Sequence, residues 1–258
     1  MSADLVVGFV AGLVVATVTA PVGVSGAVFM LPIQLSVLGV PNPAVTPTNL
    51  LYNVIASPGA LFRYARTGLV GGPLTRLLLA GTVPGVIVGA VIRVFLLPGP
   101  GVFRVVAGLV LLTLGGWLVR RTVSAPRIGR PLSSRAVAAL ALGVGVVGGV
   151  YGIGGGSILS PLLVGSGMAV AVVAPAALAS TFVTSIIGAL TFAVLALFAP
   201  GSIAPDWPIG IACGLGGLVG GYVGARLQPH LPERALRLLL GGLALAVGVL
   251  YLVEGLLR

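Results

Sequence analysis

Two long uncharged runs constrain this chain more than any other feature of its sequence. No Asp, Glu, Lys or Arg occurs in the 58 residues from Leu5 to Phe62 or in the 70 residues from Ala136 to Pro205. A helix that spans a bilayer needs about 20 consecutive apolar residues, so each run is long enough for several crossings. Charged residues make up only 7% of the chain, whereas a water-soluble domain carries roughly 25%. The sequence therefore predicts an all-α polytopic membrane protein.

The positive net charge does not indicate a nucleic-acid partner. All 14 cationic side chains are Arg, and they punctuate the apolar segments, whereas a nucleic-acid-binding surface clusters its cations. Arginines in short loops are typical of cytoplasmic connections under the positive-inside rule. We expect the lipid bilayer as a partner and no nucleic acid, and we leave open whether the chain forms a homo-oligomer.

Charges, prolines and glycines divide the chain into ten apolar segments. They lie near residues 5–20, 24–39, 44–62, 71–96, 102–119, 136–151, 153–167, 171–198, 207–227 and 235–257. The one long polar stretch, residues 120–135, holds five Arg, two Pro and three Ser residues. This stretch predicts a cytoplasmic linker between a first membrane repeat, residues 1–119, and a second, residues 136–258.

The two halves resemble each other in sequence. A shift of 129 residues places Gly23 on Gly152 and Pro32 on Pro161, and internal repeats are the usual construction of secondary transporters. If the first two segments of the second half form a hairpin that returns to the cytoplasmic side, the arginine-bearing loop near Arg226 is cytoplasmic. An odd number of passes per half then inverts the second repeat. We therefore expect two inverted repeats of about five segments each, with both termini outside the cytoplasm.

Each half opens with two short segments separated by a glycine-rich turn. The turns are Pro21–Gly26 and Gly152–Ser157, and Pro and Gly favour helix breaks there. Broken backbone at membrane depth survives only where protein or a water-filled cavity satisfies it. The helix that follows a break presents unpaired N–H groups and a positive dipole end, which attract anions. We expect broken or re-entrant hairpins that bind an anion; the alternative is that these glycines only permit close helix packing.

Polar side chains on the segment after each hairpin complete the predicted site. Asn49 and Asn53 share a helical face, and an Asn in an apolar span is costly unless it bonds a neighbouring helix or a ligand. Ser and Thr can instead bond their own helix. The candidate substrate-binding residues are Gly23, Ser25, Gly26, Thr48, Asn49, Asn53, Gly154, Gly155, Gly156, Ser157, Ser180 and Thr184.

The run Gly-Ile-Gly-Gly-Gly-Ser at 152–157, followed by Pro161 and by Gly188-Ala189, resembles the sulfite exporter TauE/SafE family of bacterial and archaeal permeases. The first copy, from Gly23 to Pro32, is degenerate and fits the two-repeat construction of that family. The resemblance implies a permease in a bacterial or archaeal plasma membrane that moves sulfite, a sulfonate or a related organosulfur anion. It leaves the exact substrate, the direction of transport and any coupling ion open.

Residues suited to catalysis or metal binding are few. His230 is the only His, in an expected loop, and Cys213 is the only Cys. The acids all lie near segment ends, where a charge is least costly: Asp4, Asp206, Glu233 and Glu254. We therefore expect no enzyme activity, metal site, cofactor or intramembrane carboxylate relay. The alternative function is a non-transporting assembly or scaffold subunit, which would not require two costly helix breaks.

Overall fold

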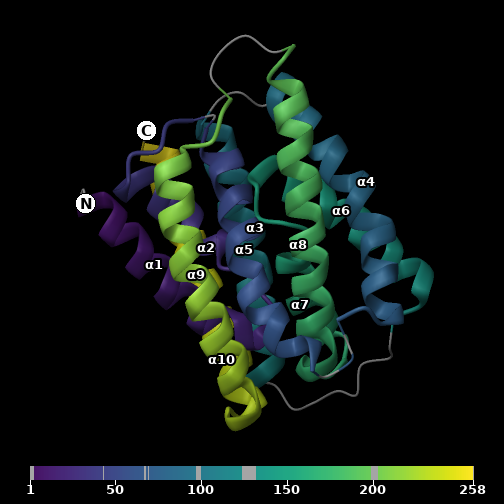
Figure 1. Cartoon of the computed structure of the whole chain (residues 1–258). Helices are drawn as coiled ribbons and strands as arrows, with labels where there is room; N and C mark the ends of the chain where they lie inside the picture. Colours follow the sequence, from purple (N-terminus) through teal and green to yellow (C-terminus); the bar gives the residue numbers. More distant parts are fainter. Residues whose placement is uncertain are drawn as a thin grey trace.

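The computed structural model of this chain describes residues 3–42, 44–66, 68, 70–96, 100–123, 132–198 and 203–257. Within these residues the regular structure is helical and no strand occurs (Figure 1). The α-helices are α1 (Ala3–Thr19), α2 (Ala27–Pro32), α3 (Val45–Ala65), α4 (Pro73–Phe95), α5 (Pro100–Val123), α6 (Ser134–Tyr151), α7 (Gly156–Gly165), α8 (Val170–Leu195), α9 (Trp207–Leu227) and α10 (Glu233–Leu257). Each of them overlaps one predicted apolar segment, so the all-α prediction is confirmed.

Five helical stretches of the described residues are long and apolar enough to cross a membrane. They are Ala3–Val22, Pro73–Phe95, Ser134–Tyr151, Val170–Leu195 and Trp207–His230. The helices α2 and α7 are shorter, as the sequence predicts. Each of them begins directly after a break that is rich in glycine.

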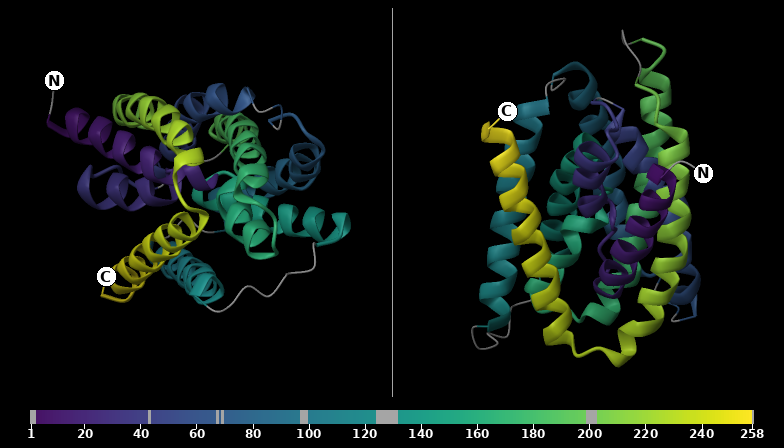
Figure 2. Two further views of the ribbon diagram at one scale, coloured as in Figure 1. Left: turned by 90° about the horizontal axis from the view of Figure 1, so that it is seen from below. Right: turned by 90° about the vertical axis from the view of Figure 1, so that its left-hand side faces the viewer.

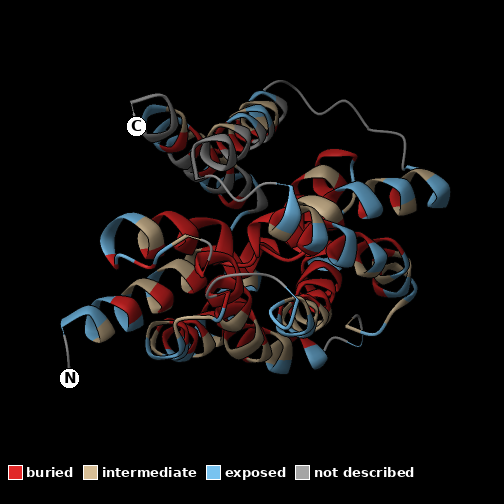
Figure 3. Cartoon of the chain, turned by 90° about the horizontal axis from the view of Figure 1, so that it is seen from above, coloured by how far each residue is buried: buried red, intermediate tan, exposed pale blue. Residues whose placement is uncertain are grey.

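Apolar side chains cover the outside of the bundle and polar side chains lie within it. On α9, for example, Leu215, Val219 and Val223 are exposed at four-residue spacing, whereas Asn49 and Asn53 of α3 are fully buried. The buried residues gather in the middle of the bundle and the exposed ones lie on its outer faces (Figure 3). A surface of this kind suits lipid, since a soluble protein rarely exposes large contiguous apolar areas.

Small residues close three pairs of helices: α1 with α9, α4 with α6, and α5 with α10. A Cβ atom added at Gly220 would overlap the carbonyl oxygen of Leu13, and one added at Gly89 would overlap that of Val146. Close packing against a neighbouring backbone occurs in the same way at Gly85, Gly89, Gly145, Gly149, Gly216, Gly220 and Gly224. In lipid the hydrophobic effect does not drive helices together. The close approach of these backbones instead provides the van der Waals contacts that hold the helices to one another.

The last helix of each half stands apart from the rest of the bundle. α5 and α10 lie side by side at one edge (Figures 2 and 3), with Gly115 placed so that a Cβ would come within 2.8 Å of the Gly241 carbonyl oxygen. Their contacts with the remaining helices are made mainly to α7, to the 3₁₀ turn Ala20–Val22 and to α2. The α5–α10 pair therefore covers the two short helices from one side.

Segment 24–39, predicted as one helix, is divided in the structure. The α-helical part α2 ends at Pro32 and a π-helical turn, Ile33–Val37, follows. Pro32 has no N–H group to donate, so one hydrogen bond of the α-helical pattern is missing where α2 ends. A wider π turn is the local solution, and such turns occur frequently at functional sites.

The polar stretch between the halves is partly helical. α5 continues to Val123 and α6 begins at Ser134, with the Ser133 hydroxyl accepting from the Ala136 N–H at 3.3 Å. Both ends of the predicted linker 120–135 therefore belong to helices, and residues 124–131 lie outside the described residues.

The packing of α1 on α9 predicts a sharp effect of a single methyl group. Gly220→Ala should lower the free energy of unfolding by about 1–3 kcal/mol, because the new Cβ must displace the backbone of Leu13. Gly143→Ala is the matched control, since a Cβ there meets nothing within 4 Å, and it should leave stability unchanged or slightly raised. Thermal unfolding in detergent would measure both; equal effects would contradict this account of the interface.

Candidate functional site

Both predicted helix breaks are present, and each has a glycine in the left-handed conformation at the equivalent position. Gly23 has φ +72° and Gly152 has φ +67°; these residues are 129 apart. Only glycine adopts this left-handed region without strain. Gly23 ends the 3₁₀ turn Ala20–Val22, and Gly152 ends α6 with its N–H directed at the Gly148 carbonyl.

At the first break, a serine organises the start of α2. The Ser25 hydroxyl accepts from the Ala27 N–H at 3.1 Å and donates to Oδ1 of Asn53. Asn49, one turn earlier on α3, donates from Nδ2 to the Ala27 carbonyl at 2.9 Å. The two Asn residues that the sequence places on one face of α3 therefore both reach the first turn of α2.

At the second break, a threonine of α8 bonds the backbone just before α7 begins. The Gly155 N–H donates to Oγ1 of Thr184 at 3.2 Å, so this N–H is already paired and is not a free donor for an anion. The Ser157 hydroxyl donates back to the Ile153 carbonyl at 2.8 Å. The N–H groups of Gly156 and Ser157 open α7, where a helix has no intrahelical acceptor to offer.

Two side chains join the breaks across the middle of the molecule. Nδ2 of Asn53 donates to the Gly152 carbonyl at 3.4 Å, while its Oδ1 is held by Ser25. On the other side, the Ser160 hydroxyl of α7 donates to the Val22 carbonyl. The two breaks are therefore neighbours in space, although 129 positions separate Gly23 from Gly152 in the sequence.

The packing interpretation of the break glycines also has support. A Cβ at Gly156 would overlap the Ala177 carbonyl, and one at Gly155 would come within 2.5 Å of the Thr82 side chain. Each of these glycines thus allows a neighbouring helix to approach. A bulky residue at Gly155 would disturb packing directly, and it cannot by itself distinguish a binding role from a structural one.

Three buried hydroxyl groups facing or flanking the breaks have no hydrogen-bond partner among the described residues: Tyr52, Thr181 and Ser185. A Cβ at Gly26 would overlap the Tyr52 hydroxyl, and one at Gly154 would lie 2.6 Å from Cγ2 of Thr181. Tyr52 and Thr181 are 129 residues apart. An unpaired hydroxyl in an apolar interior is costly, and here one faces each break from the equivalent helix.

Sequence reasoning overlooked Tyr52, because an aromatic residue in an apolar span is most simply interpreted as core. The repeat offset could have indicated it, since it pairs Tyr52 with the polar Thr181. Gln34, a fully buried amide in the π-helical turn, was overlooked as well. Its amide lies beside the Cys213 thiol, a weak hydrogen-bonding group, and neither amide atom has a geometrically acceptable partner among the described residues.

Three predicted site residues serve mainly to join helices to one another. Thr48 donates to the Ala44 carbonyl of its own helix and accepts from the Asp206 N–H at 2.8 Å. The Ser180 hydroxyl pairs with that of Thr82 at 3.0 Å. Thr184 donates to the Ser180 carbonyl at 2.7 Å and faces the second break only through its bond from Gly155.

One buried charge lies in the last turn of α4. Arg93 of α4 is 1% exposed; its Nε donates to Oγ1 of Thr46 at 3.3 Å and its Nη2 to Oδ1 of Asn42. Its counterpart in the second half, Arg226, is exposed. A shift of 133 residues pairs these two arginines in the sequence, but it does not indicate that only one of them is buried.

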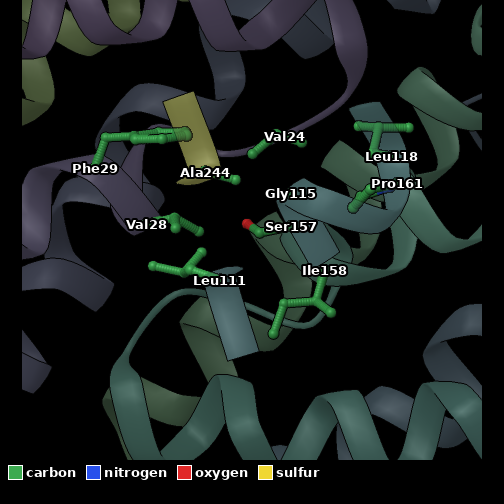
Figure 4. Close-up of a pocket in the computed structure, with 10 residues that line it drawn as sticks. All are labelled: Val24, Val28, Phe29, Leu111, Gly115, Leu118, Ser157, Ile158, Pro161 and Ala244. Atoms are coloured by element: carbon green, nitrogen blue, oxygen red, sulfur yellow. The ribbon is translucent and has the colours of Figure 1, made fainter. Parts of the chain in front are cut away.

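Two small cavities adjoin the breaks. The one drawn in Figure 4 has a volume of about 30 Å³ and lies between the two short helices and the α5–α10 pair, with the Ser157 oxygen directed into it. Its lining is Val24, Val28, Phe29, Leu111, Gly115, Leu118, Ser157, Ile158, Pro161 and Ala244. The other, about 20 Å³, lies against the first break and includes Ser25, Gly26, Tyr52 and Ser57 in its lining. Cavities of this size hold a water molecule and not a larger anion.

A comparison with known protein families shows to which family the chain belongs. The family model described as sulfite exporter TauE/SafE matches residues 8–251. The chain belongs to the sulfite exporter TauE/SafE family. No curated protein and no solved structure matches the chain.

TauE/SafE proteins are membrane transporters and not enzymes, and the long apolar helices agree with an integral, multi-pass membrane permease. Within the described part of the chain no three His, Cys, Asp or Glu residues gather as a metal site. His230 is exposed on a short 3₁₀ turn, Gln228–His230. The Asp206 carboxylate caps α9 by accepting from the Ile209 N–H at 3.1 Å.

The bridge between the breaks can be tested through Asn53. Asn53→Leu should leave the Ser25 hydroxyl and the Gly152 carbonyl without their partner, at about 1–3 kcal/mol for each orphaned group. Thr113→Val is the control, since the Thr113 hydroxyl is exposed and bonds only the Leu109 carbonyl of its own helix. Thermal unfolding of both variants is the measurement, and an Asn53 variant as stable as the control would refute the bridge.

Proposed function

We propose that this TauE/SafE protein is a secondary permease for a small anion, of the class of sulfite, sulfonates and related organosulfur anions. The anion is bound between the two glycine breaks, in the plasma membrane of a bacterium or archaeon. The observation that carries the proposal is the pair of unpaired hydroxyls of Tyr52 and Thr181, one facing each break. A buried O–H without a partner is stabilised by an acceptor that arrives with a ligand.

The donors suit an oxyanion. The helical segment Ala27–Val37 and helix α7 each begin beside a break, and the opening N–H groups of a helix favour negative charge. The hydroxyls of Tyr52, Thr181 and Ser185 add O–H donors from α3 and α8. The anion would be held by neutral donors without a dedicated cation, which keeps it free to leave.

The predicted binding residues divide by role under this proposal. Direct contacts are assigned to the segments around the breaks, comprising Gly23, Ser25, Gly26, Gly154, Gly156 and Ser157, with Asn49 alongside. Gly155, Asn53 and Thr184 instead hold the breaks in place, because their polar atoms bond one another or the opposite break. Thr48 and Ser180 lie further from the anion and position the helices around it. Thr48 bonds the start of α9, and Ser180 bonds α4.

Admission of the anion requires movement. The cavities at the breaks hold no more than water, so sulfite needs the surrounding helices to separate. We assign this movement to the α5–α10 pair, which packs mainly on itself and covers the breaks through Leu111, Leu118 and Ala244. A scaffold subunit would need neither this loose pair nor unpaired hydroxyls in its interior.

The helix contacts support an inverted repeat. Exchanging α1–α5 with α6–α10 maps the α1–α9 contact onto the α6–α4 contact, and the α3–α9 contact onto the α8–α4 contact. The α3–α4 and α9–α10 junctions, which carry the exposed Arg66, Arg76, Arg226 and Arg234, lie at the same end of the bundle (Figure 1). We infer that this end is cytoplasmic, with both termini on the other side.

The two unpaired hydroxyls offer a test in which stability and function change in opposite directions. Tyr52→Phe and Thr181→Val remove a buried hydroxyl that has no protein partner, so the free energy of unfolding should stay the same or rise. The affinity for sulfite, measured by thermal stabilisation at increasing sulfite concentration, and the sulfite uptake into proteoliposomes should each fall about tenfold or more for either variant.

Tyr64→Phe is the matched control. The Tyr64 hydroxyl donates to the Ala20 carbonyl at 3.1 Å, so its removal should lower stability while the response to sulfite is kept. If Tyr52→Phe and Thr181→Val respond to sulfite like the parent protein, the proposed site is wrong.

The orientation can be tested by labelling. In a Cys213→Ala background, Ser2→Cys and Gly255→Cys should react with a membrane-impermeant thiol reagent from the outside only, and Arg66→Cys from the cytoplasmic side only. Labelling of either terminus from the cytoplasmic side alone would refute the inverted arrangement.

A further inference from the structure

Asn49 presents a hydrogen-bond acceptor that cannot be a donor. Its Nδ2 donates to the Ala27 carbonyl at 2.9 Å, and a carbonyl only accepts, which fixes the orientation of the amide. The other atom, Oδ1, is then an acceptor, and it has no partner among the described residues. The side chain is fully buried, so bulk water does not solvate this oxygen. A ligand that binds here must bring a donor to satisfy it.

The second half of the chain has no polar group at this position. The equivalent residue of the second half, 129 positions later, is Leu178, which is also buried. Both halves form a long helix at this place, α3 and α8, and an amide in one with a leucine in the other points to a role beyond packing. A buried amide with an unpaired oxygen lowers stability, so an apolar side chain would serve the structure better.

Tyr52 supplies the complementary group. It lies three residues after Asn49 on α3, hence on the same face of the helix, and its unpaired hydroxyl faces Gly26 and lines the cavity at the first break. Tyr52 therefore brings an unpaired O–H donor to Gly26, next to Ala27, whose carbonyl holds the Asn49 amide. This pair matches a ligand that has both an anionic oxygen and a hydroxyl group.

We propose that the anion is bound and carried as a monoanion that keeps one acidic proton, with Asn49 Oδ1 accepting the hydrogen bond from that proton. The inference rests on the proposed anion site. For sulfite the species is hydrogensulfite: its charged oxygens accept from Tyr52 and the backbone N–H groups, and its hydroxyl donates to Asn49. The sulfite dianion has no proton to donate, so its oxygen would face the lone pairs of Asn49 Oδ1 and would be repelled.

This choice of species couples transport to pH without a carboxylate relay. Each hydrogensulfite that crosses takes one proton with it, which is released when the ion becomes sulfite on the more alkaline side. Among the described residues the buried polar interior contains no Asp or Glu, and under this proposal none is needed. The substrate itself is the proton carrier.

Other titratable groups lie on α3 with Asn49 or contact its neighbouring residues Thr46, Thr48 and Tyr52, and they have to be controlled for. They are Tyr52 on its own helix, Cys213 and Asp206 on α9, and Arg93 on α4; α2 and α8 carry no titratable side chain. Methanesulfinate provides the control ligand. It has the shape and charge of hydrogensulfite with a methyl group in place of the hydroxyl, and it stays a monoanion around neutral pH.

The experiment compares the two anions on the purified full-length protein, by thermal stabilisation and by uptake into proteoliposomes, on both sides of neutral pH. At fixed total sulfite, the effect of sulfite should fall as the pH rises, in proportion to the hydrogensulfite that remains, while the effect of methanesulfinate stays level. Below neutral pH, hydrogensulfite should bind at least about tenfold more tightly than methanesulfinate, because only hydrogensulfite satisfies the buried oxygen.

Asn49→Leu installs the residue that the second half carries and should abolish this preference, while binding of methanesulfinate is kept or improved. That retained binding also shows that the variant is folded. Gln34→Leu is the matched control: it replaces another fully buried, unpaired amide with the residue found at its equivalent position, Leu163. It should leave the ratio between the two anions unchanged.

Each outcome is decisive. Sulfite binding that rises with pH, equal affinity for the two anions in the parent protein, or an unchanged preference in Asn49→Leu would overturn the inference and leave the anion site standing. Loss of the preference in both variants would overturn the assignment to Asn49. If neither anion binds the parent protein, the proposed function fails together with the inference.

Discussion

The structure depends on one amide that holds two broken helices together inside an apolar bundle. Asn53 accepts from Ser25 at the first break and donates to the Gly152 carbonyl at the second. In lipid, backbone groups freed by a helix break must find partners within the protein. By using both ends of a single side chain, α3 satisfies one group from each break and fixes the distance between them. The position of the proposed anion site follows from this link.

Around that link, the bundle separates two kinds of contact. Glycine faces bring α1 onto α9 and α4 onto α6 so closely that a single Cβ would meet backbone, which makes these pairs rigid. The α5–α10 pair meets the breaks chiefly through apolar side chains and small cavities. Hydroxyl groups without partners lie at the breaks, between these two closely packed pairs and the α5–α10 pair, which has few contacts with the other helices. A ligand that supplies their partners there would stabilise the bundle where its own hydrogen bonding is incomplete.

The sequence predicted a large part of this. The two uncharged runs required a polytopic helical protein, and prolines and glycines located both breaks. The face formed by Asn49 and Asn53 was also predicted, because an amide in an apolar span must bond something. The sequence did not predict that the Gly155 N–H is already paired with Thr184, or that Thr82 occupies the space beside Gly155. Those contacts join residues far apart in the chain, and no local pattern encodes them.

Tyr52 and Arg93 show where the limit lies. In the sequence, Tyr52 looks like any other aromatic residue in an apolar span. Arg93 looks like any other arginine near the end of a segment, and the repeat pairs it with Arg226, which is exposed. Composition and spacing determined the class of protein, the helices and the places where they break, because these depend on the local chemistry of the backbone and on its solvent. Which hydroxyls lack a partner, and which arginine is buried, was decided only by the tertiary structure. Burial and hydrogen bonding are properties of the neighbours that a side chain acquires when distant helices pack.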